Sequence, residues 1–309
     1  MGIPPDISEP LLPPDKEAIL LDAIQKTFAH GRLGTDNWRP IADAEIQKRL
    51  YWFKYRYTPW MNSVLPISGT SILEIGTGTG CSCIPLLEAG AEVTSIDISD
   101  ADLHIAKLRA DLHNVADRVS FHRINAAEIG NVFPNSKFDL IVYFACLEHM
   151  TYQERILSLR SAWSLLAPGQ FLAVCDTPNR LWYYDEHTAL QNFFHWLPDE
   201  IAVDYAARTP RAVFNVEFVS RGTDDTVRLS RWGRGVSYHD FEIAMNVDAR
   251  ELEVHGEWQY RRETSDPQWW ADVWMNSKDG QFHRFLRSVA PELPIAFVEP
   301  ELALMIRKR

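Results

Sequence analysis

Short apolar runs alternate with amphipathic stretches between residues 70 and 176 of this 309-residue chain. Runs of roughly four to eight apolar residues bounded by glycine or polar residues are typical of buried strands, and an apolar period of about 3.6 predicts helices. The alternation predicts a parallel sheet with helices on both faces and right-handed crossovers. Strands are predicted at 71–75, 91–97, 118–124, 137–144 and 170–176.

Three pairs of residues have the spacing of capping boxes, in which a hydroxyl and a carboxylate three positions later satisfy the first amides of a helix. Each pair predicts the start of a helix, and the first two helices are expected to extend to about residues 113 and 167. The pairs are Ser99 with Asp102, Thr151 with Glu154, and Ser237 with Asp240.

Two further amphipathic stretches precede the strands. One begins at Asp15 and ends near Gly31, and the other carries apolar residues from Ile46 to Tyr57. Pro59 is predicted to end the second helix, because proline has no amide hydrogen and its ring disturbs the preceding turn. The first 14 residues are rich in proline and acidic residues and predict a flexible arm. Residues 1–69 are therefore expected to form this arm and a helical lid.

The regular alternation is lost after residue 176. Ten of the eleven tryptophans lie outside residues 70–176, and only Trp163 lies within them. We expect residues 177–236 to form an inserted cap over the substrate site, with aromatic walls. Residues 237–309 are expected to complete the sheet, with strands at 250–259 and 303–309 and a helical insertion at 265–274. The predicted fold class is α/β, a Rossmann-like seven-stranded and mostly parallel sheet with N-terminal helices and this cap.

Composition is that of an ordinary globular protein, with 46% hydrophobic and 24% charged residues. The net charge of −11 disfavours a nucleic-acid partner, and no apolar run is long enough to predict a membrane span. The N-terminus lacks the basic start and apolar middle of a signal peptide. The four cysteines are expected to be buried thiols of a reducing compartment, so a cytoplasmic enzyme is the leading prediction.

Three glycines at alternate positions follow the first predicted strand, in the stretch SILEIGTGTGCSC from Ser71 to Cys83. A dinucleotide-binding turn has the spacing G-x-G-x-x-G, which would place its third glycine at Cys81. The carboxylate of Glu74 would also oppose a pyrophosphate at this turn, whereas a ligand with an ammonium group would be attracted.

This turn resembles the E-x-G-x-G-x-G motif of the class I S-adenosylmethionine-dependent methyltransferases. Later segments, FACLEHM and LLAPGQFLAV, resemble further motifs of that family, so the resemblance covers residues 70–176 in order. It implies that Asp97 accepts hydrogen bonds from both ribose hydroxyls of S-adenosyl-L-methionine, and that Asn125 replaces an acid which meets the adenine. The implied cofactor-binding residues are Glu74, Gly76, Thr77, Gly78, Gly80, Asp97, Ile98, Asn125, Ala126, Phe144, Leu147 and His149.

The stretch from Asp176 to Pro198 resembles the T-P-N-R, D-x-H-T and W-L-P pattern of some bacterial small-molecule methyltransferases. His187 is the candidate catalytic base, oriented by the carboxylate of Asp185. The alternative is that Asp185 caps a helix beginning near His187 while His187 only fills space. His195 is expected to be structural.

The expected function is methyl transfer from S-adenosyl-L-methionine to oxygen or nitrogen of a small-molecule acceptor. No metal is expected, because Phe144 and Ala145 stand where catechol-type enzymes carry a metal-binding acid. Two alternatives stay open: a nicotinamide-dependent oxidoreductase on a related sheet, and a non-catalytic methyltransferase-like binding module. The identity of the acceptor is not predicted from the sequence, and a homodimer is the candidate oligomeric state.

Overall fold

The computed structural model of this chain describes residues 11–28, 44–134, 136–265 and 267–309. The chain divides into two compact units, unit 1 (residues 1–126 and 137–142) and unit 2 (residues 127–136 and 143–309). Most of the predicted arm at 1–14, and the predicted helix end near Gly31, lie outside the described residues. No helix in the described ranges combines the length and the apolar character that a membrane span requires.

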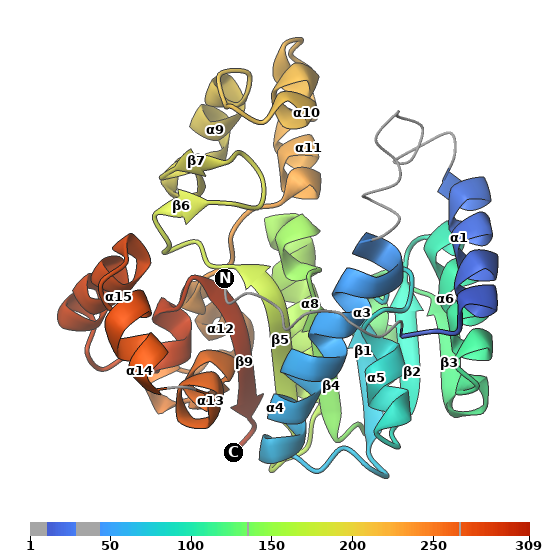
Figure 1. The fold of residues 1–309 in the computed structure, drawn as a ribbon. Coiled ribbons are helices and arrows are strands. Elements are labelled where there is room, and N and C mark those ends of the chain that lie inside the picture. Colours follow the sequence, from blue (N-terminus) through green and yellow to red (C-terminus); the bar gives the residue numbers. More distant parts are fainter. Residues whose placement is uncertain (1–10, 29–43, 135, 266) are drawn as a thin grey trace. The chain divides into compact units, whose positions relative to one another are not determined.

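Seven strands form one sheet in the order β3-β2-β1-β4-β5-β9-β8, which confirms the predicted fold class (Figure 1). β2 pairs in parallel with β1 and with β3, whereas β9 is antiparallel to both β5 and β8. β4 begins in unit 1 and ends in unit 2. The strands are β1 Ser71–Ile75, β2 Glu92–Asp97, β3 Val119–Arg123, β4 Leu140–Phe144, β5 Phe171–Pro178, β8 Glu253–Gly256 and β9 Glu301–Arg307.

Helix α1 (Pro14–Phe28) packs beside α6 (Asp100–Leu112) in unit 1 (Figure 1). Leu20, Ile24 and Phe28 follow the helical period along α1 and are buried in a cluster with Ile46 and Ile105. The hydroxyl of Ser99 accepts the amide hydrogen of Asp102 at 3.2 Å, which confirms the predicted start of α6. The other α-helix after β1 in this unit is the short α5 (Cys83–Glu88).

The predicted helix end at Pro59 is wrong. Helical turns continue from Ala44 to Val64, as η1 (Ala44–Lys48), α3 (Arg49–Trp52), η2 (Phe53–Tyr57) and α4 (Thr58–Val64). η2 is a π-helical turn, in which the Thr58 amide donates to the carbonyl of Phe53 five residues earlier. Pro59 follows this π-helical turn in the first turn of α4, a position at which proline is common because its missing amide hydrogen is tolerated there.

Unit 2 contains α8 (Tyr152–Leu165) and α12 (Tyr238–Met245), which pack against each other and both begin with the predicted capping boxes. The predicted strand at 250–259 is too long. β8 ends at Gly256, and Glu257 begins helix α13 (Glu257–Thr264), in which its buried carboxylate faces Arg261 one turn later. The predicted helix at 265–274 is confirmed as α14 (Pro267–Trp269) followed by the π-helical turn η9 (Trp270–Trp274).

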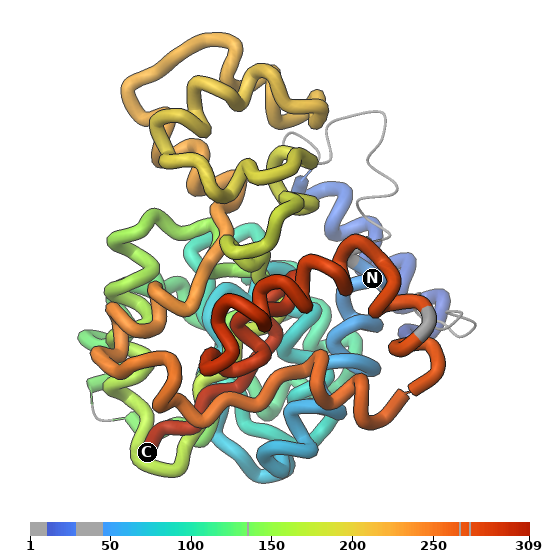
Figure 2. Tube along the Cα trace, turned by 90° about the vertical axis from the view of Figure 1, so that its left-hand side faces the viewer, coloured from blue at the N-terminus to red at the C-terminus, as the bar shows by residue number. Residues whose placement is uncertain are grey.

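The segment from β6 to α11 forms a lobe of unit 2, coloured yellow to light orange in Figure 2. It has its own core, in which Phe194, Phe214 and Phe218 pack with Val203 and Leu229. Four tryptophans after Asp176 form another buried cluster of unit 2, which explains part of the tryptophan distribution. They are Trp182, Trp258, Trp270 and Trp274. The elements of the lobe are β6 Tyr184–Asp185, β7 Gln191–Asn192, η6 Phe194–Trp196, α9 Asp199–Ala206, α10 Ala212–Asn215, η7 Val216–Phe218 and α11 Asp225–Trp232.

The remaining helices are short, apart from α15. They connect strands or follow β8 along the chain. They are η3 Ala116–Arg118, η4 Ala126–Glu128, α7 Ile129–Val132, η5 Leu147–His149, η8 Ala249–Glu251, α15 Lys278–Val289 and η10 Ile295–Val298.

Glu154 provides a pH-dependent contribution to the stability of unit 2. Its carboxylate accepts the Thr151 amide at 2.8 Å and pairs with Arg231 at 2.7 and 2.8 Å. These donors, Arg231 above all, lower the pKa of Glu154 from 4.5 to about 2. Because the pKa is lower in the folded state, the stabilisation is present above pH 4.5 and is lost as the pH falls towards 2.

We therefore expect Glu154→Gln to lower the free energy of unfolding by about 1–2 kcal/mol at pH 7, allowing for solvent screening, and by much less near pH 2. Glutamine keeps part of the capping box, so the change isolates the charge. Denaturant titrations across this pH range measure the difference. Asp22→Asn, in an exposed pair with Lys26, is the control and should have almost no effect. A Glu154→Gln difference that is constant with pH would contradict the assignment.

Candidate active site

The glycine turn after β1 needs glycine for its backbone conformation. Gly76, Gly78 and Gly80 have φ values of +78°, +51° and +84°, in the left-handed region that other L-residues rarely adopt. Gly80 also lies against α6, where an added Cβ would be 3.0 Å from Cα of Ala106. An added Cβ at Gly78 would have no atom within 4 Å. The turn is therefore packed against its own unit at Gly80 and open at Gly78.

Glu74 holds this turn from inside unit 1. Its side chain is fully buried, and its two carboxylate oxygens accept hydrogen bonds from the hydroxyls of Ser82 and Ser95. Burial raises the pKa of Glu74, although these hydroxyls oppose the shift. The structure thus gives Glu74 a role in joining β1, β2 and the start of α5, while its predicted contact with a cofactor stays a prediction.

Asp97 lies where β2 ends, beside the glycine turn. Its carboxylate accepts the amide of Gly78 at 2.9 Å through one oxygen and the amide of Ser99 at 2.9 Å through the other. Desolvation is the main cause that raises the pKa of Asp97. The next residue, Ile98, is 62% exposed, which is unusual for a large apolar side chain beside a buried sheet.

The other predicted cofactor residues of unit 1 follow the ends of β1 and β3. Asn125 is exposed and Ala126 is buried, directly after β3. The carboxyl ends of adjacent parallel strands form the edge at which open α/β sheets bind ligands. The structure therefore brings together, on one edge of unit 1, the predicted residues Gly76, Thr77, Gly78, Gly80, Asp97, Ile98, Asn125 and Ala126.

Arg109 is a residue of this region that the sequence analysis missed. It is fully buried in α6, and its Nε donates to the carbonyl of Thr79 in the glycine turn at 2.7 Å. The signal was an arginine among the apolar positions of the helix, since a buried arginine requires acceptors.

In unit 2, the turn Leu147–His149 (η5) follows β4 and is held by arginines. It begins two residues after Ala145, whose φ of +45° is strained for a residue with a Cβ. Each of its carbonyl oxygens accepts a hydrogen bond, which fixes the backbone that carries Glu148 and His149. The donors, in chain order, are Arg155 Nε (2.9 Å), the backbone amide of Arg234 (2.8 Å) and Arg231 Nη1 (2.9 Å).

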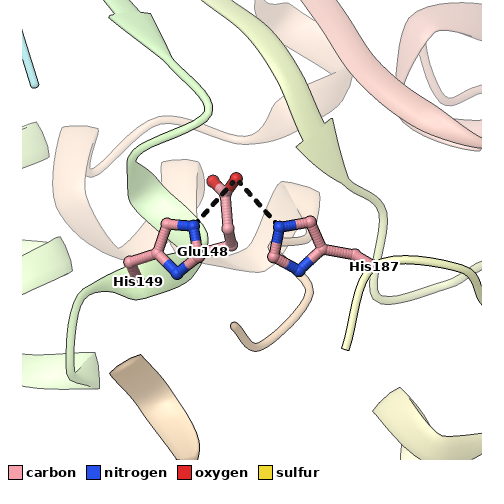
Figure 3. Close-up of side chains that lie close together, drawn as sticks. All are labelled: Glu148, His149 and His187. Atoms are coloured by element: carbon pink, nitrogen blue, oxygen red, sulfur yellow. Dashed lines mark ion pairs between the residues drawn. The ribbon is translucent and has the colours of Figure 1, made fainter. Parts of the chain in front are cut away.

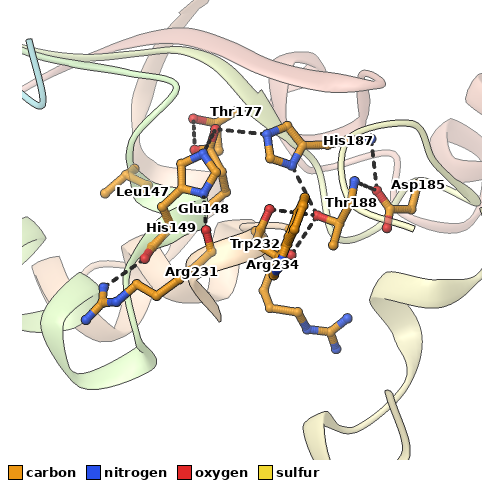
Figure 4. A network of polar contacts seen from close by, with 12 residues as sticks. Leu147, Glu148, His149, Thr177, Asp185, His187, Thr188, Arg231, Trp232 and Arg234 are labelled. Atoms are coloured by element: carbon orange, nitrogen blue, oxygen red, sulfur yellow. Dashed lines mark hydrogen bonds and ion pairs between the residues drawn. The ribbon is translucent and has the colours of Figure 1, made fainter. Parts of the chain in front are cut away.

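A bulge in β5 directs a hydroxyl to Glu148. The register with β9 shifts between Val174 and Thr177, and Asp176 in between has a φ of +53°. The hydroxyl of Thr177 then lies 3.3 Å from Oε2 of Glu148, which is fully buried (Figure 4). Bulges re-aim side chains in this way near functional sites.

The expectation that Asp185 orients the ring of His187 is wrong. Its Oδ1 accepts the backbone amides of His187 (3.0 Å) and Thr188 (2.7 Å), and its Oδ2 accepts that of Ala189 (2.8 Å). The ring nitrogen Nε2 of His195 lies 3.2 Å from the same carboxylate. His195 and these amides outweigh desolvation and lower the pKa of Asp185 to about 2. Asp185 therefore caps a local turn rather than the helix that the alternative expected, and His195 is buried beside it.

The ring of His187 instead faces Glu148 and His149 (Figures 3 and 4). Its Nε2 is 3.9 Å from Oε1 of Glu148, and its centroid is 5.1 Å from that of His149. Burial, and secondarily the nearby His149, lower the pKa of His187 to about 3, so the ring is neutral near pH 7. A Cβ at Gly233 would lie 2.6 Å from Nδ1 of His187, so this glycine allows the ring to pack closely.

Unit 2 also has a surface cleft of about 490 Å³. Tyr152 and Trp196 contribute aromatic surface to it, and Arg180 contributes a positive charge. The cleft shares no lining residue with the group formed by Glu148, His149 and His187. The aromatic-walled substrate pocket thus stays a prediction.

Residues 72–169 match the family model of a methyltransferase domain. This match and the strand order agree with the class I methyltransferase fold that the motifs of this segment predict.

Two curated relatives and one solved structure illustrate the similarity. A ubiquinone biosynthesis O-methyltransferase of Rhodopseudomonas palustris (strain TIE-1) is 33% identical over 38% of this chain and 43% of its own length. A release factor glutamine methyltransferase of Chlorobaculum tepidum is 36% identical over 33% and 37%. The magnesium protoporphyrin IX methyltransferase of Synechocystis PCC 6803, solved with bound SAM, is 20% identical over 54% of this chain and 78% of that chain, with a TM-score of 0.38. The chain spans less than half the length of these two curated relatives.

The two glycines provide a matched test of how the turn is packed. Alanine at Gly78 costs only the left-handed conformation, about 1–2 kcal/mol. Alanine at Gly80 adds a clash with the backbone of α6, about 1–3 kcal/mol more. We expect Gly80→Ala to lower the urea midpoint clearly more than Gly78→Ala. Equal midpoints for the two variants would contradict the close approach of the turn to α6.

Proposed function

We propose that this protein is a methyltransferase that uses S-adenosyl-L-methionine to methylate oxygen or nitrogen of a small-molecule acceptor. The observation that carries the proposal is the edge of unit 1 at the ends of β1 and β2. There a left-handed glycine turn and the carboxylate of Asp97 are joined by the bond from the Gly78 amide, within the matched methyltransferase domain.

The chemistry of this edge suits the proposed cofactor. Each carboxylate oxygen of Asp97 accepts one backbone amide and has a further electron pair that can accept a ribose hydroxyl. The open space at Gly78 lets the backbone approach the methionyl part, and the amide oxygen of Asn125 can accept from the adenine amino group. The other expected cofactor contacts stay predictions. In unit 1 they involve Glu74, Gly76, Thr77, Gly80, Ile98 and Ala126, and in unit 2 they involve Phe144, Leu147 and His149.

The reaction is an in-line displacement at the sulfonium methyl group. An electron pair of the acceptor forms the bond to the methyl carbon while the carbon–sulfur pair returns to sulfur, which leaves a neutral thioether. The enzyme's contribution is to align the acceptor and to exclude water.

The acceptor side is proposed to involve His187 and, through the turn that it caps, Asp185. The relatives named O-methyltransferases favour oxygen as the methylated atom. We further propose that the protein is cytoplasmic, as the cysteine usage of the sequence predicts. Several expectations from the sequence stay predictions. They are a lid formed by residues 1–69, a cap formed by residues 177–236, the domain boundaries at 70–176 and 237–309, and a homodimer.

Asp97→Ala tests the cofactor assignment. Losing hydrogen bonds to a charged acceptor should raise the Kd for S-adenosylhomocysteine about tenfold or more by calorimetry. Asp117→Ala, at an exposed carboxylate of η3, is the control and should bind as the wild type does. An unchanged affinity in a folded Asp97→Ala variant would remove Asp97 from the site, and tight binding of a nicotinamide dinucleotide in place of S-adenosylhomocysteine would favour the oxidoreductase.

His187→Ala tests the acceptor side, once a screen with isotope-labelled S-adenosyl-L-methionine has identified an acceptor. We expect single-turnover rates to fall about 10²–10⁴-fold, whereas the Kd for S-adenosylhomocysteine hardly changes. Asp185→Asn should cost less, because asparagine can still accept backbone amides. A near-normal rate for His187→Ala would show that this loop only shapes the protein.

A further inference from the structure

Three side chains of unit 2 direct one donor atom each toward a common point (Figure 3). They are Glu148, His149 and His187, and their donor atoms all lie within 4.8 Å of one another. Oε1 of Glu148 is 3.8 Å from Nε2 of His149 and 3.9 Å from Nε2 of His187. Both distances exceed that of an N–H···O hydrogen bond, so a proton shared with the carboxylate does not explain the arrangement.

The other ring nitrogens define the tautomers. Nδ1 of His149 is 2.9 Å from the carbonyl oxygen of Arg231, which can only accept, so Nδ1 carries the hydrogen. Nδ1 of His187 is 3.1 Å from the hydroxyl of Thr188, which donates its single hydrogen to the carbonyl of Gly233 at 2.8 Å. This hydroxyl must therefore accept from His187. In the neutral form of each ring, Nε2 therefore carries the electron pair that could bind an ion.

Two imidazole nitrogens and one carboxylate oxygen at these distances form a donor set that one cation can bind. A ring hydrogen donated from Nδ1 to protein oxygen, which fixes the orientation of Nε2, is the usual outer-shell arrangement of metal-binding histidines. We propose that Glu148, His149 and His187 together bind one divalent transition-metal ion.

The donor set selects the class of metal. Two imidazoles and one carboxylate suit zinc, iron, cobalt or manganese, whereas magnesium and calcium prefer oxygen ligands alone. Metal–ligand distances of about 2.0–2.2 Å place ligand atoms about 3.0–3.6 Å apart, so side-chain shifts of about half an ångström close the site. The side chains of His149 and His187 are 40% and 32% exposed, which gives an ion a route from solvent.

The backbone around the three ligands is fixed in advance. Arg155, Arg231 and Arg234 hold the carbonyls of Leu147–His149, and Asp185 caps the turn that carries His187. Thr177 orients the second carboxylate oxygen of Glu148. Phe144 and Ala145 supply no ligand, and the carboxylate comes instead from Glu148, slightly later in the chain. The expectation of no metal considered only residues 144 and 145, and not Glu148.

Three protein ligands leave coordination positions open, and this gives the site a role that rests on the proposed function. An acceptor hydroxyl bound to the ion would lose its proton to water more readily. The resulting oxygen electron pair would form the bond to the methyl carbon, and the carbon–sulfur pair would return to sulfur.

The test is metal binding to the full chain after removal of metals with a chelator. Titration with Zn²⁺ alone should show one site per chain by calorimetry, and Co²⁺ alone should produce the absorption bands of a protein-bound ion. His149→Gln and His187→Gln should each weaken Zn²⁺ binding about tenfold or more. Because Glu148→Gln changes a fully buried side chain and can unfold the protein, the two histidine variants carry the test.

His255→Gln is the matched control. His255 is 40% exposed, as His149 is, and its Nε2 lies 3.6 Å from a single carboxylate of Glu253. This variant should bind Zn²⁺ as the wild type does. The proposal is overturned if the wild type binds no stoichiometric Zn²⁺, or if folded His149→Gln and His187→Gln bind it unchanged.

Binding of S-adenosylhomocysteine to the metal-free protein is measured separately. If that binding is absent while the Zn²⁺ result holds, the proposed function fails and the metal site stands. If S-adenosylhomocysteine binds and Zn²⁺ does not, the metal site fails and the proposed function stands.

Discussion

A carboxylate buried beneath a glycine turn is the constraint on which the candidate cofactor edge depends. Glu74 lies in β1 and accepts hydrogen bonds from the hydroxyls of Ser82 and Ser95, so one side chain joins two strands and the start of α5. A buried carboxylate without such donors would cost several kcal/mol. The turn between these anchors can therefore keep its left-handed backbone and direct the Gly78 amide to Asp97.

In unit 2, buried arginines rather than a buried carboxylate hold the backbone of a turn. The buried guanidinium of Arg155 pairs with Asp240 and donates to the Leu147 carbonyl, and the backbone amide of Arg234 donates to the Glu148 carbonyl, so both residues fix the turn that carries Glu148 and His149. The buried guanidinium of Arg234 is itself held by Asp199 and the carbonyl of Phe194. Fixed turns reduce the reorganisation that a ligand would otherwise have to drive. The convergence of Glu148, His149 and His187 is a product of this framework rather than of neighbouring positions in the sequence.

Patterns that depend on local chemistry were predictable from the sequence. The strands from β1 to β5, the three capped helices and the glycine turn follow from apolar runs and from hydroxyl–carboxylate spacing. What depended on distant partners was not predictable. Asp185 binds His195 and backbone amides instead of the His187 ring. The local π-helical turn that precedes Pro59 within the helical run was missed as well. No local sequence pattern predicts that the ring of His187 faces the carboxylate of Glu148.

The most direct test of the central claim is a crystal structure of the protein with S-adenosylhomocysteine. The account predicts that both ribose hydroxyls bind the carboxylate of Asp97 and that the amino-acid part of the ligand lies along the turn from Gly76 to Gly80. Density for the ligand elsewhere on the molecule, with the Asp97 carboxylate bonded only to the amides of Gly78 and Ser99, would contradict it.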